Sequence, residues 1–415
     1  MNFFLYNLFI HLYHLAIRII GLFNKKARLW VRGRKDIFRR LENEISHDRP
    51  IVWFHCASLG EFEQGRPVIE ACKETFPQKR ILLTFFSPSG YEIRKNYTGA
   101  DYIFYLPIDT QRNARRFISI VKPELAVFVK YEYWFNFMRE LRKNQIPQIF
   151  ISAIFRPEQR FFSKWGRWQL KQLSKVNRFF VQNQDAADIL KNAGIQQVTV
   201  SGDTRFDRVF SIAQQKQDFP LIRHFKGDSQ LLLAGSTWPA DEEIILELIH
   251  ADQMNLKFVI APHEVDPERI QSLMSKMPGK PVKYSEADEN KVIDAKVLVI
   301  NNIGILSHLY QYATLAYIGG GFGVGIHNIL EAATFGNPVI FGPRYQKFRE
   351  AIDLIESGGA FSIRSKSDFL EIAIALLADN QKLDTASANA KQYVERMRGA
   401  TKIIMDYLIN TLGEK

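Results

Sequence analysis

The chain has 415 residues, of which 46% are hydrophobic, and a formal net charge of +11. This length exceeds what one hydrophobic core usually serves, so we expect two domains. The only cysteines, Cys56 and Cys72, are too few for a disulfide framework or a cysteine zinc site, which favours a reducing compartment. The positive charge raises the question of a nucleic-acid partner, but no zinc-finger spacing and no RNP-like aromatic segment occurs, so none is expected.

The N-terminal segment is predicted to attach the chain to a membrane. Residues 3–23 are mostly apolar or aromatic, and basic residues crowd the stretch from Lys25 to Arg40. A cleaved signal peptide carries its positive charge before the apolar run, which is not the order here. The run is long enough to span a bilayer, but Arg18 and two histidines equally suit a helix that lies in the interface. In both cases the basic flank keeps the rest of the chain on the cytoplasmic side, at an anionic membrane surface.

Short apolar runs alternate with amphipathic stretches in the remaining chain, a pattern typical of βαβ units and a parallel sheet. In the first half, strands are expected at 51–54, 81–85, 102–106, 125–129, 148–151 and 178–181. In the second half, they are expected at 231–234, 257–261, 297–300, 315–318 and 338–341. A polar segment without a pattern, residues 213–227, separates the two halves. The sequence therefore predicts two Rossmann-like domains facing across a cleft, the usual place for a ligand.

The segment His55-Cys-Ala-Ser-Leu-Gly-Glu61 follows the first expected strand and precedes an expected helix over 62–76. The break at Gly60 puts Glu61 in the first helical turn, at the carboxyl edge of the sheet, where open α/β folds bind ligands. An ionised carboxylate at that position is a candidate general base. A structural interpretation is also open, because Ser58 and Glu61 have the spacing of a capping box, in which the carboxylate accepts a backbone N–H.

Three segments of the second half are candidates for nucleotide binding, and Gly319-Gly-Gly-Phe-Gly-Val-Gly-Ile-His-Asn-Ile-Leu-Glu331 is the most informative. Its glycines let the backbone approach a phosphate, and the expected helix N-terminus after them offers N–H donors and a positive dipole end. Asn328 and Glu331 are three residues apart, so they are expected to share a helix face from which the carboxylate can bind paired ribose hydroxyls. The other two segments are Ser236-Thr237, expected to cap a helix, and Ala261-Pro-His-Glu264, which closes a strand; either also fits a purely structural role.

Absent motifs narrow the chemistry further. No G-x-G-x-x-G occurs in the glycine-rich segment, which disfavours a dinucleotide-dependent oxidoreductase, and Gly279-Lys280 lacks the earlier glycine of a P-loop. The chain contains no Asp-x-Asp and no His-Glu-x-x-His. A metal-dependent hydrolase or a metal-chelating transferase is therefore not expected, and we predict neither a metal site nor a cofactor.

Taken together, these motifs resemble the lipid A Kdo transferases, the 3-deoxy-D-manno-octulosonic acid transferases of Gram-negative bacteria. The matching pieces occur in order over nearly the whole chain: Arg28–Lys35, Ala57–Glu61, Gly202–Asp207, Ser236–Thr237 with Glu242–Glu243, Gly319–Gly320, His327–Glu331 and Gly342–Pro343. The resemblance implies a GT-B fold with an N-terminal membrane-anchor helix. Its expected parts are the anchor and basic flank over residues 1–35, an acceptor-binding domain over 36–212, a CMP-sugar domain over 213–387 and closing helices over 388–415.

The same resemblance implies transfer of Kdo from CMP-Kdo to a lipid A precursor of the lipid IVA type, in lipopolysaccharide biosynthesis at the cytoplasmic face of the inner membrane. Transfer is expected to be metal-independent and inverting, with Glu61 as the catalytic base and Arg205 stabilising the transition state. The expected CMP contacts are Pro262, His263, Ile303, Gly304, Ile305, Asn328, Ile329, Leu330 and Glu331.

This chain also departs from the family pattern. Lys130 stands where the family has the first acid of Glu-x-Glu-Leu-Trp-Pro, a position assigned to transition-state stabilisation, so either Lys130 or Glu132 is the catalytic group there. His263 replaces an arginine, Ile303-Gly-Ile305 replaces Met-Gly-Glu, and Trp238 replaces a histidine, which indicates a rearranged CMP site. The alternative is a GT-B transferase that uses a different nucleotide sugar on another membrane lipid; it leaves Ala57–Glu61 without a role.

Overall fold

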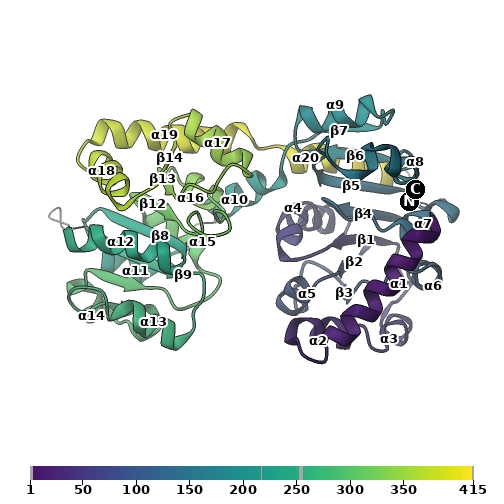
Figure 1. Cartoon of the computed structure of the whole chain (residues 1–415), viewed down its shortest axis with the longest axis horizontal. Coiled ribbons are helices and arrows are strands. Elements are labelled where there is room, and N and C mark those ends of the chain that lie inside the picture. The colour runs from purple at the N-terminus through teal and green to yellow at the C-terminus, as the bar shows by residue number, and fades with distance from the viewer. Residues whose placement is uncertain (1–2, 216, 252–255, 414–415) are drawn as a thin grey trace. The chain divides into compact units, whose positions relative to one another are not determined.

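The structure is a computed structural model that describes residues 3–215, 217–251 and 256–413. It contains two compact units. The first comprises Met1–Arg208 together with Arg398–Lys415, and the second comprises Val209–Met397. Each unit is built on a seven-stranded sheet whose paired strands are all parallel, with helices on both faces (Figure 1).

The first unit contains every strand that the sequence predicts for the first half, plus one short edge strand. Its strands are β1 (Ile51–Cys56), β2 (Arg80–Phe85), β3 (Tyr102–Tyr105), β4 (Leu125–Val129), β5 (Gln148–Ala153), β6 (Arg178–Val181) and the unpredicted β7 (Val198–Val200), in the order β3-β2-β1-β4-β5-β6-β7. Its helices are α1 (Phe3–Ile20), α2 (Lys25–Arg32), α3 (Ile37–Glu44), α4 (Leu59–Thr75), α5 (Pro88–Arg94), α6 (Gln111–Val121), α7 (Phe135–Lys143), α8 (Arg167–Leu173), α9 (Gln184–Asn192), the start of α10 (Thr204–Gln214) and α20 (Ala400–Leu412).

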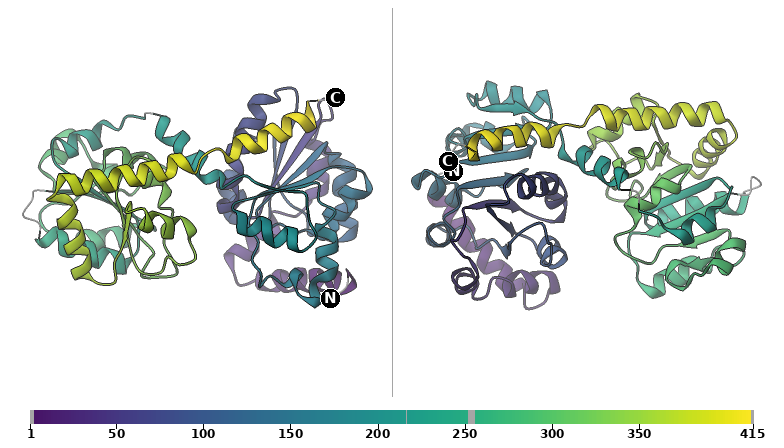
Figure 2. Two further views of the ribbon diagram at one scale, coloured as in Figure 1. Left: turned by 90° about the horizontal axis from the view of Figure 1, so that it is seen from above. Right: turned by 180° about the vertical axis from the view of Figure 1, so that it is seen from behind.

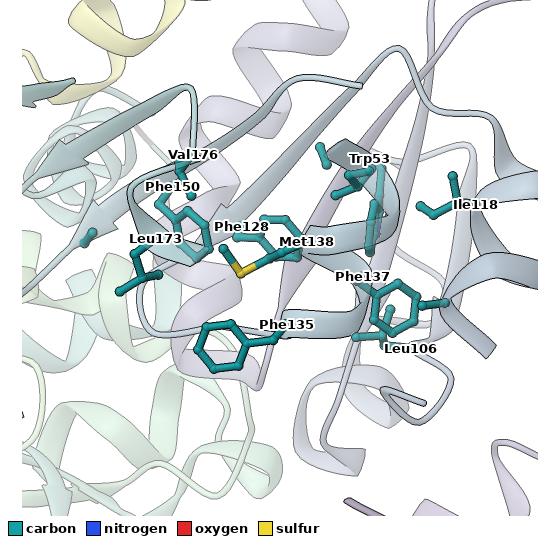
Figure 3. Packing of buried hydrophobic residues seen from close by; sticks show 14 of the residues in the cluster. Trp53, Leu106, Ile118, Phe128, Phe135, Phe137, Met138, Phe150, Leu173 and Val176 are labelled. Atoms are coloured by element: carbon teal, nitrogen blue, oxygen red, sulfur yellow. The ribbon is translucent and has the colours of Figure 1, made fainter. Parts of the chain in front are cut away.

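Side chains of the central strands alternate between two hydrophobic cores, as the period of a strand requires. Trp53 and Phe128 point to the core that is shared with α6 and α7, part of which Figure 3 shows. Val52 and Phe54 point to the opposite core, which α4 and α20 cover. Because both faces are covered, the strands are apolar at most positions, which explains why they could be recognised as nearly continuous runs.

The second unit repeats this architecture. Its strands are β8 (Leu231–Thr237), β9 (Lys257–Pro262), β10 (Val282–Lys283), β11 (Val297–Val299), β12 (Leu315–Ile318), β13 (Val339–Phe341) and β14 (Ala360–Ser362), in the order β10-β11-β9-β8-β12-β13-β14. Its helices are the end of α10, α11 (Pro220–Lys226), α12 (Pro239–Ala251), α13 (Pro267–Met274), α14 (Glu289–Asp294), α15 (Leu306–Leu309), α16 (Leu330–Ala333), α17 (Arg349–Glu356), α18 (Lys366–Leu377) and α19 (Asn380–Arg396). All five predicted strands are present, and the short strands β10 and β14 are additional.

Three segments differ from expectation. Residues 213–227, expected to lack structure, include α11, whose Ile222 and Phe225 are buried. The expected boundary between 387 and 388 lies inside α19, and the chain returns to the first unit at Arg398, where it forms α20 (Figure 2). The helix expected over 62–76 begins earlier, at Leu59.

The two sheets reverse their strand order at corresponding positions, the topological switch points. Without the edge strands β7 and β10, both have the strand order 3-2-1-4-5-6 of nucleotide-binding α/β folds. The order reverses between β1 and β4 in the first unit and between β8 and β12 in the second. Segments that follow these four strands are therefore the places where such folds bind ligands.

Helix α1 is packed along the first unit and exposes an apolar outer face. Among the described residues it is the only helix long and apolar enough to cross a membrane. Its Tyr6 and Ile10 are buried, and the Tyr6 hydroxyl donates a hydrogen bond to buried Asp109, which also accepts the Asn136 backbone N–H. Asn136 in turn donates to Asn7 of α1 at 3.0 Å. Large apolar side chains on the other face are exposed: Phe4, Leu5, Leu8, Phe9, Leu12, Leu15, Ile19 and Ile20.

Candidate functional site

Glu61 lies in the first turn of α4, directly after β1. Ser58 occupies the N-cap position, yet its side chain makes no capping hydrogen bond. Instead the Ser58 hydroxyl donates to Glu61 Oε2. The capping-box interpretation is therefore wrong for this pair, because the two side chains bond to each other. The Glu61 carboxylate is half-buried at the carboxyl edge of the sheet, beside a hydroxyl that orients it.

Arg205 is brought to the same edge by the buried residue that precedes it. The Thr204 hydroxyl donates to the backbone carbonyl of Gln64 in α4 and lies 2.8 Å from the Ser152 hydroxyl at the end of β5. The Arg205 side chain is held by Asp203, which accepts its Nε–H at 2.8 Å. The start of α10 is thereby fixed to the helix that carries Glu61.

Tyr131 lies within electrostatic range of several charged side chains of the first unit, Glu61 and Arg205 among them. Burial raises the pKa of the Tyr131 hydroxyl, and the charges of Arg156, Glu61 and Arg205 act on it as well. Because Coulomb effects fall off with distance, these charges all lie near the end of β4. The first unit therefore places two carboxylates, those of Glu61 and Asp203, and two guanidinium groups in the neighbourhood of one phenol.

Lys130 and Glu132 lie in different surroundings, although they are two residues apart. Lys130 has a left-handed backbone, with φ of 69°, and its Nζ lies 5.5 Å from the centre of the Tyr131 ring. Glu132 Oε2 accepts the Trp134 indole N–H at 2.7 Å and lies 3.1 Å from His55 Nε2. The carboxylate of Glu132 is therefore engaged in a polar cluster with His55 and Trp134. Sequence reasoning gave His55 no role; its polar ring in an otherwise apolar strand was the available signal.

In the second unit, the glycine-rich segment approaches other backbone very closely. Gly320 has φ of 92° and donates its N–H to Asp241 at 2.9 Å. A Cβ on Gly321 would lie 2.6 Å from the Cα of Gly342. The glycines that follow β12 and β13 are thus in direct contact, which explains why both positions lack a side chain.

Asp241 performs the capping that the sequence analysis assigned to Ser236 and Thr237. Its carboxylate accepts the Trp238 backbone N–H at 2.9 Å at the start of α12. Both Ser236 and Thr237 belong to β8 instead, and the Thr237 hydroxyl donates to Glu242 at 3.0 Å. The predicted helix start is confirmed, but its cap is a carboxylate within the helix.

The helix after the glycine-rich segment is much shorter than expected. Helix α16 spans only Leu330–Ala333, so it supplies little dipole, and Asn328 lies before it. The Asn328 side chain donates to Glu331 Oε1 at 3.0 Å and accepts the Leu330 N–H at 3.2 Å. Ile329 and Leu330 have buried side chains, so only their backbone can meet a ligand.

A stack of three rings, which the sequence did not predict, lies beside this segment. The ring of His263 is 4.7 Å from that of Trp238 and 4.5 Å from that of His327, both nearly parallel to it. The Trp238 indole N–H donates to His327 Nε2 at 3.0 Å. Burial, followed by the proximity of His263, lowers the pKa of His327 to about 4. His327 is therefore neutral at physiological pH and acts as a hydrogen-bond acceptor.

The remaining predicted contacts lie at the same edge of the second sheet. Pro262 ends β9, and the His263 N–H donates to the Thr237 carbonyl at 3.0 Å. Ile303, Gly304 and Ile305 follow the neighbouring strand β11, and Gly304 has φ of 99°. Ile303 is 87% exposed. Within the described part of the chain, no group of three or more His, Cys, Asp or Glu side chains is placed to hold a metal ion.

Comparison with solved structures defines the class of protein. The fold is similar to that of a putative UDP-N-acetylglucosamine 2-epimerase from Listeria monocytogenes, with a TM-score of 0.61 and 14% sequence identity, over 88% of this chain and 98% of that one. The protein therefore has a GT-B-like fold of two parallel-sheet α/β domains.

Sequence comparison gives the family. The family described as 3-deoxy-D-manno-octulosonic-acid transferase (kdotransferase) matches residues 32–208. A 3-deoxy-D-manno-octulosonic acid transferase from Rickettsia bellii is 29% identical over 401 residues, which is 91% of this chain and 92% of the relative. One from Aquifex aeolicus is 26% identical over 366 residues, or 86% of this chain and 95% of the relative. Over most of its length the chain is therefore similar to Kdo transferases, which are glycosyltransferases, and residues 32–208 match the model of that family.

Proposed function

We propose that this enzyme transfers Kdo from CMP-Kdo to a hydroxyl group of a lipid A precursor of the lipid IVA type. The observation that carries the proposal is the position of Glu61 after β1, at the switch point, with a hydroxyl partner in Ser58 rather than a backbone N–H. A carboxylate that is not needed to cap its helix can accept the proton of an attacking alcohol.

The proposed reaction is a single displacement with inversion. Glu61 takes the proton of the acceptor hydroxyl while that oxygen forms a bond to the anomeric carbon of Kdo. The bond from this carbon to the phosphate oxygen breaks, and CMP leaves with the bonding electron pair. Negative charge therefore develops on the phosphate, and cationic groups stabilise it. We assign this role to Arg205 and Lys130, because Glu132 is engaged by Trp134 and His55.

We assign donor binding to the second unit. Glu331 already accepts a hydrogen bond from Asn328, and a carboxylate has further acceptor sites for the paired ribose hydroxyls. Pro262 is the last residue of β9, and His263 follows it. The loop Ile303–Ile305 follows β11, and the segment Asn328–Glu331 follows β12; the carboxyl ends of these three strands share one edge. Ile329 and Leu330 contribute backbone groups, since their side chains are buried.

We further propose that the enzyme works on the cytoplasmic face of the inner membrane, with α1 lying in the interface. A spanning helix has to leave the protein body, whereas the first half of α1 is held to it by Tyr6, Asn7 and Ile10. Its outer face is apolar, and the basic flank that follows is suited to anionic headgroups.

The proposed function is tested by incubating the purified full chain with CMP-Kdo and a tetraacylated, bis-phosphorylated glucosamine disaccharide. We expect the mass of the acceptor to increase by one or more Kdo residues, with release of CMP. A parallel incubation with UDP-N-acetylglucosamine is the control. Transfer from the UDP-sugar, with none from CMP-Kdo, would reject the proposal and favour the alternative transferase.

A further inference from the structure

The first unit contains a strongly basic cavity that the proposed chemistry does not use. The cavity has a volume of about 630 Å³ and lies between α1, α2, the first turn of α3 and the start of α6. Six cationic side chains line it, against a single acid, Asp36. The cations are Arg18, Arg32, Arg34, Lys35, Arg39 and Arg116. Such an excess of one charge in a concave site attracts a ligand of the opposite charge.

Arg34 is the most deeply placed of these cations. Its guanidinium donates to the backbone carbonyls of Leu106, Trp30 and Phe86 at 2.7–3.0 Å, and it lies 3.8 Å from the centre of the Trp30 ring. Among the described residues no carboxylate forms an ion pair with it. Burial lowers the pKa of Arg34 to about 9, so it stays charged at neutral pH in surroundings that disfavour an unpaired cation. An anion bound in the cavity would offset the free-energy cost of burying the Arg34 charge without a partner of opposite charge.

The rim of the cavity also carries cations for which the described part of the chain supplies no partner. Within the described residues, the side chains of Arg18, Arg32, Lys35 and Arg39 form no hydrogen bond or ion pair, whereas Arg116 is paired with Glu42 at 2.8 Å. Several guanidinium groups around one hollow suit a phosphate, because each presents a planar fork of donors to its oxygens.

An apolar hollow adjoins the basic cavity. It has a volume of about 300 Å³ and is lined by Tyr13, Ile17 and Ile20 of α1, and by Trp30 and Phe86. Trp30 lines both spaces, so a basic pocket and an apolar one lie on either side of one ring. This combination fits a lipid that carries phosphate, and a free phosphate metabolite would make no use of the apolar side.

The cavity is also connected to the segment that carries Glu61. Phe86 accepts a hydrogen bond from Arg34, and the next residue, Ser87, donates its N–H to the Ala57 carbonyl at 2.7 Å. The Phe86 ring lies 4.7 Å from that of Trp134, which binds Glu132. A lipid held at Arg34 therefore lies close to the edge of the sheet that carries the half-buried Glu61.

We infer that the Arg34 cavity binds a phosphate monoester of the lipid acceptor and thereby holds the acceptor sugar at the edge that carries Glu61. The identity of the acceptor rests on the proposed function. The cavity's charge, its apolar neighbour and the hydrogen bonds that link Arg34 to Phe86 and Ser87 to Ala57 do not depend on that identity.

The test substitutes residues at the rim of the cavity and leaves Arg34 in place, because Arg34 also donates to three backbone carbonyls and its loss would disturb the fold. In the triple variant Arg32→Gln, Lys35→Gln, Arg39→Gln, we expect the KM for the bis-phosphorylated acceptor to rise about tenfold, since each exposed charge contributes a factor of about two. The kcat and the KM for CMP-Kdo should stay unchanged. Assays in neutral detergent micelles exclude a general effect of membrane charge. The matched control neutralises Lys171, Lys175 and Lys191, which are exposed on α8 and α9 or just beyond them.

A binding measurement without donor separates this inference from the proposed function. We expect the wild type to bind the bis-phosphorylated acceptor more tightly than its fully dephosphorylated form, and the rim variant to lose this preference. Equal binding of both forms by the wild type, or an unchanged preference in the rim variant, would overturn the inference even if Kdo transfer is observed. Displacement of the acceptor by an equal amount of phosphatidylglycerol would also overturn it, because the cavity would then take any lipid phosphate.

Discussion

The two units share a strand order, but they present different chemistry at the switch point. In the first unit the segments after β1 and β4 carry charged side chains, Glu61 and Lys130, and hydrogen bonds from Ser58 and Thr204 hold the edge together. In the second unit the segments after β8 and β12 carry glycines and stacked rings, with Gly321 touching Gly342 through backbone atoms. The sheet edge of the first unit is therefore suited to proton transfer, and that of the second unit to close binding of a ligand, although the two sheets have the same strand order.

The comparison also shows how each edge tolerates change. A charged side chain can be replaced by a neutral isostere without disturbing the fold, so we expect such a substitution in the first unit to lower the rate of transfer. A glycine in backbone contact cannot gain a methyl group without moving that backbone, so its loss should appear in stability. The following predictions test this division between the units.

The largest effect is expected from Glu61→Gln. The amide cannot accept the acceptor proton, so transfer should fall by at least about a hundredfold, the usual scale of losing a general base. Binding of CMP, measured by calorimetry, should be unchanged, because the second unit is not altered. Glu63→Gln is the control on the same helix, since Glu63 is paired with Arg94 at 2.7 Å. Near-normal turnover of the Glu61→Gln variant would show that Glu61 is not the catalytic base.

Gly321→Ala should damage the second unit alone. Its Cβ would lie 2.6 Å from the backbone of Gly342, and this overpacking should lower the free energy of unfolding of that unit by about 2 kcal/mol. Urea unfolding monitored separately in the two units measures the change. Gly323→Ala is the matched control, because the nearest atom to its Cβ is 3.5 Å away. Equal free energies of unfolding for Gly321→Ala and Gly323→Ala would show that the backbone around Gly321 and Gly342 can move to accept a methyl group.

The stacked rings predict a pH dependence of the second unit. His327 has its pKa lowered to about 4 in the folded protein, against 6.5 for an ordinary histidine, so only the unfolded chain takes up a proton between these values. Stability from this group is therefore complete above pH 6.5 and is lost progressively as the pH falls from 6.5 towards 4. Urea unfolding at neutral pH and at a pH within this range measures this loss. His327→Asn should show a smaller loss, and an equal loss in both proteins would contradict the assignment.

The smallest effect is expected from Glu331→Ala. Loss of one charged hydrogen-bond acceptor for the ribose should raise the KM for CMP-Kdo about fivefold, with little change in kcat. This is the opposite of the pattern expected for Glu61→Gln. Glu371→Ala, an exposed carboxylate on α18, serves as the control. An unchanged KM for the donor would reject the ribose role of Glu331.

Much of the fold could be predicted because both sheets are buried on both faces. Strands such as β1 and β8 are continuous apolar runs between turn residues, and each of the eleven predicted strands is present. The missed strands, β7, β10 and β14, have two or three residues and lie at sheet edges, where burial leaves a weaker pattern. Helix α11 was missed because only two of its side chains, Ile222 and Phe225, are buried.

The sequence predicted where the site residues lie in the fold better than it predicted which hydrogen bonds and ring contacts they form. Spacing placed Glu61 in the first turn of a helix, and that prediction is confirmed. Spacing could not show that Ser58 bonds to the carboxylate, because a hydroxyl three residues earlier can also bind backbone. The stack of Trp238, His263 and His327 joins three strand ends that are far apart in the sequence, so no local pattern reveals it.

The position of α20 has a consequence for how the molecule is made. Asp207, two residues after Arg205, accepts the N–H groups of Gly399 and Thr401, and α20 covers one core of the first unit. The ribosome synthesises α20 only after the whole second unit, which is one uninterrupted stretch. The second unit can therefore fold first, while the first unit is completed, and its Arg205 segment fixed, only after α20 has been synthesised.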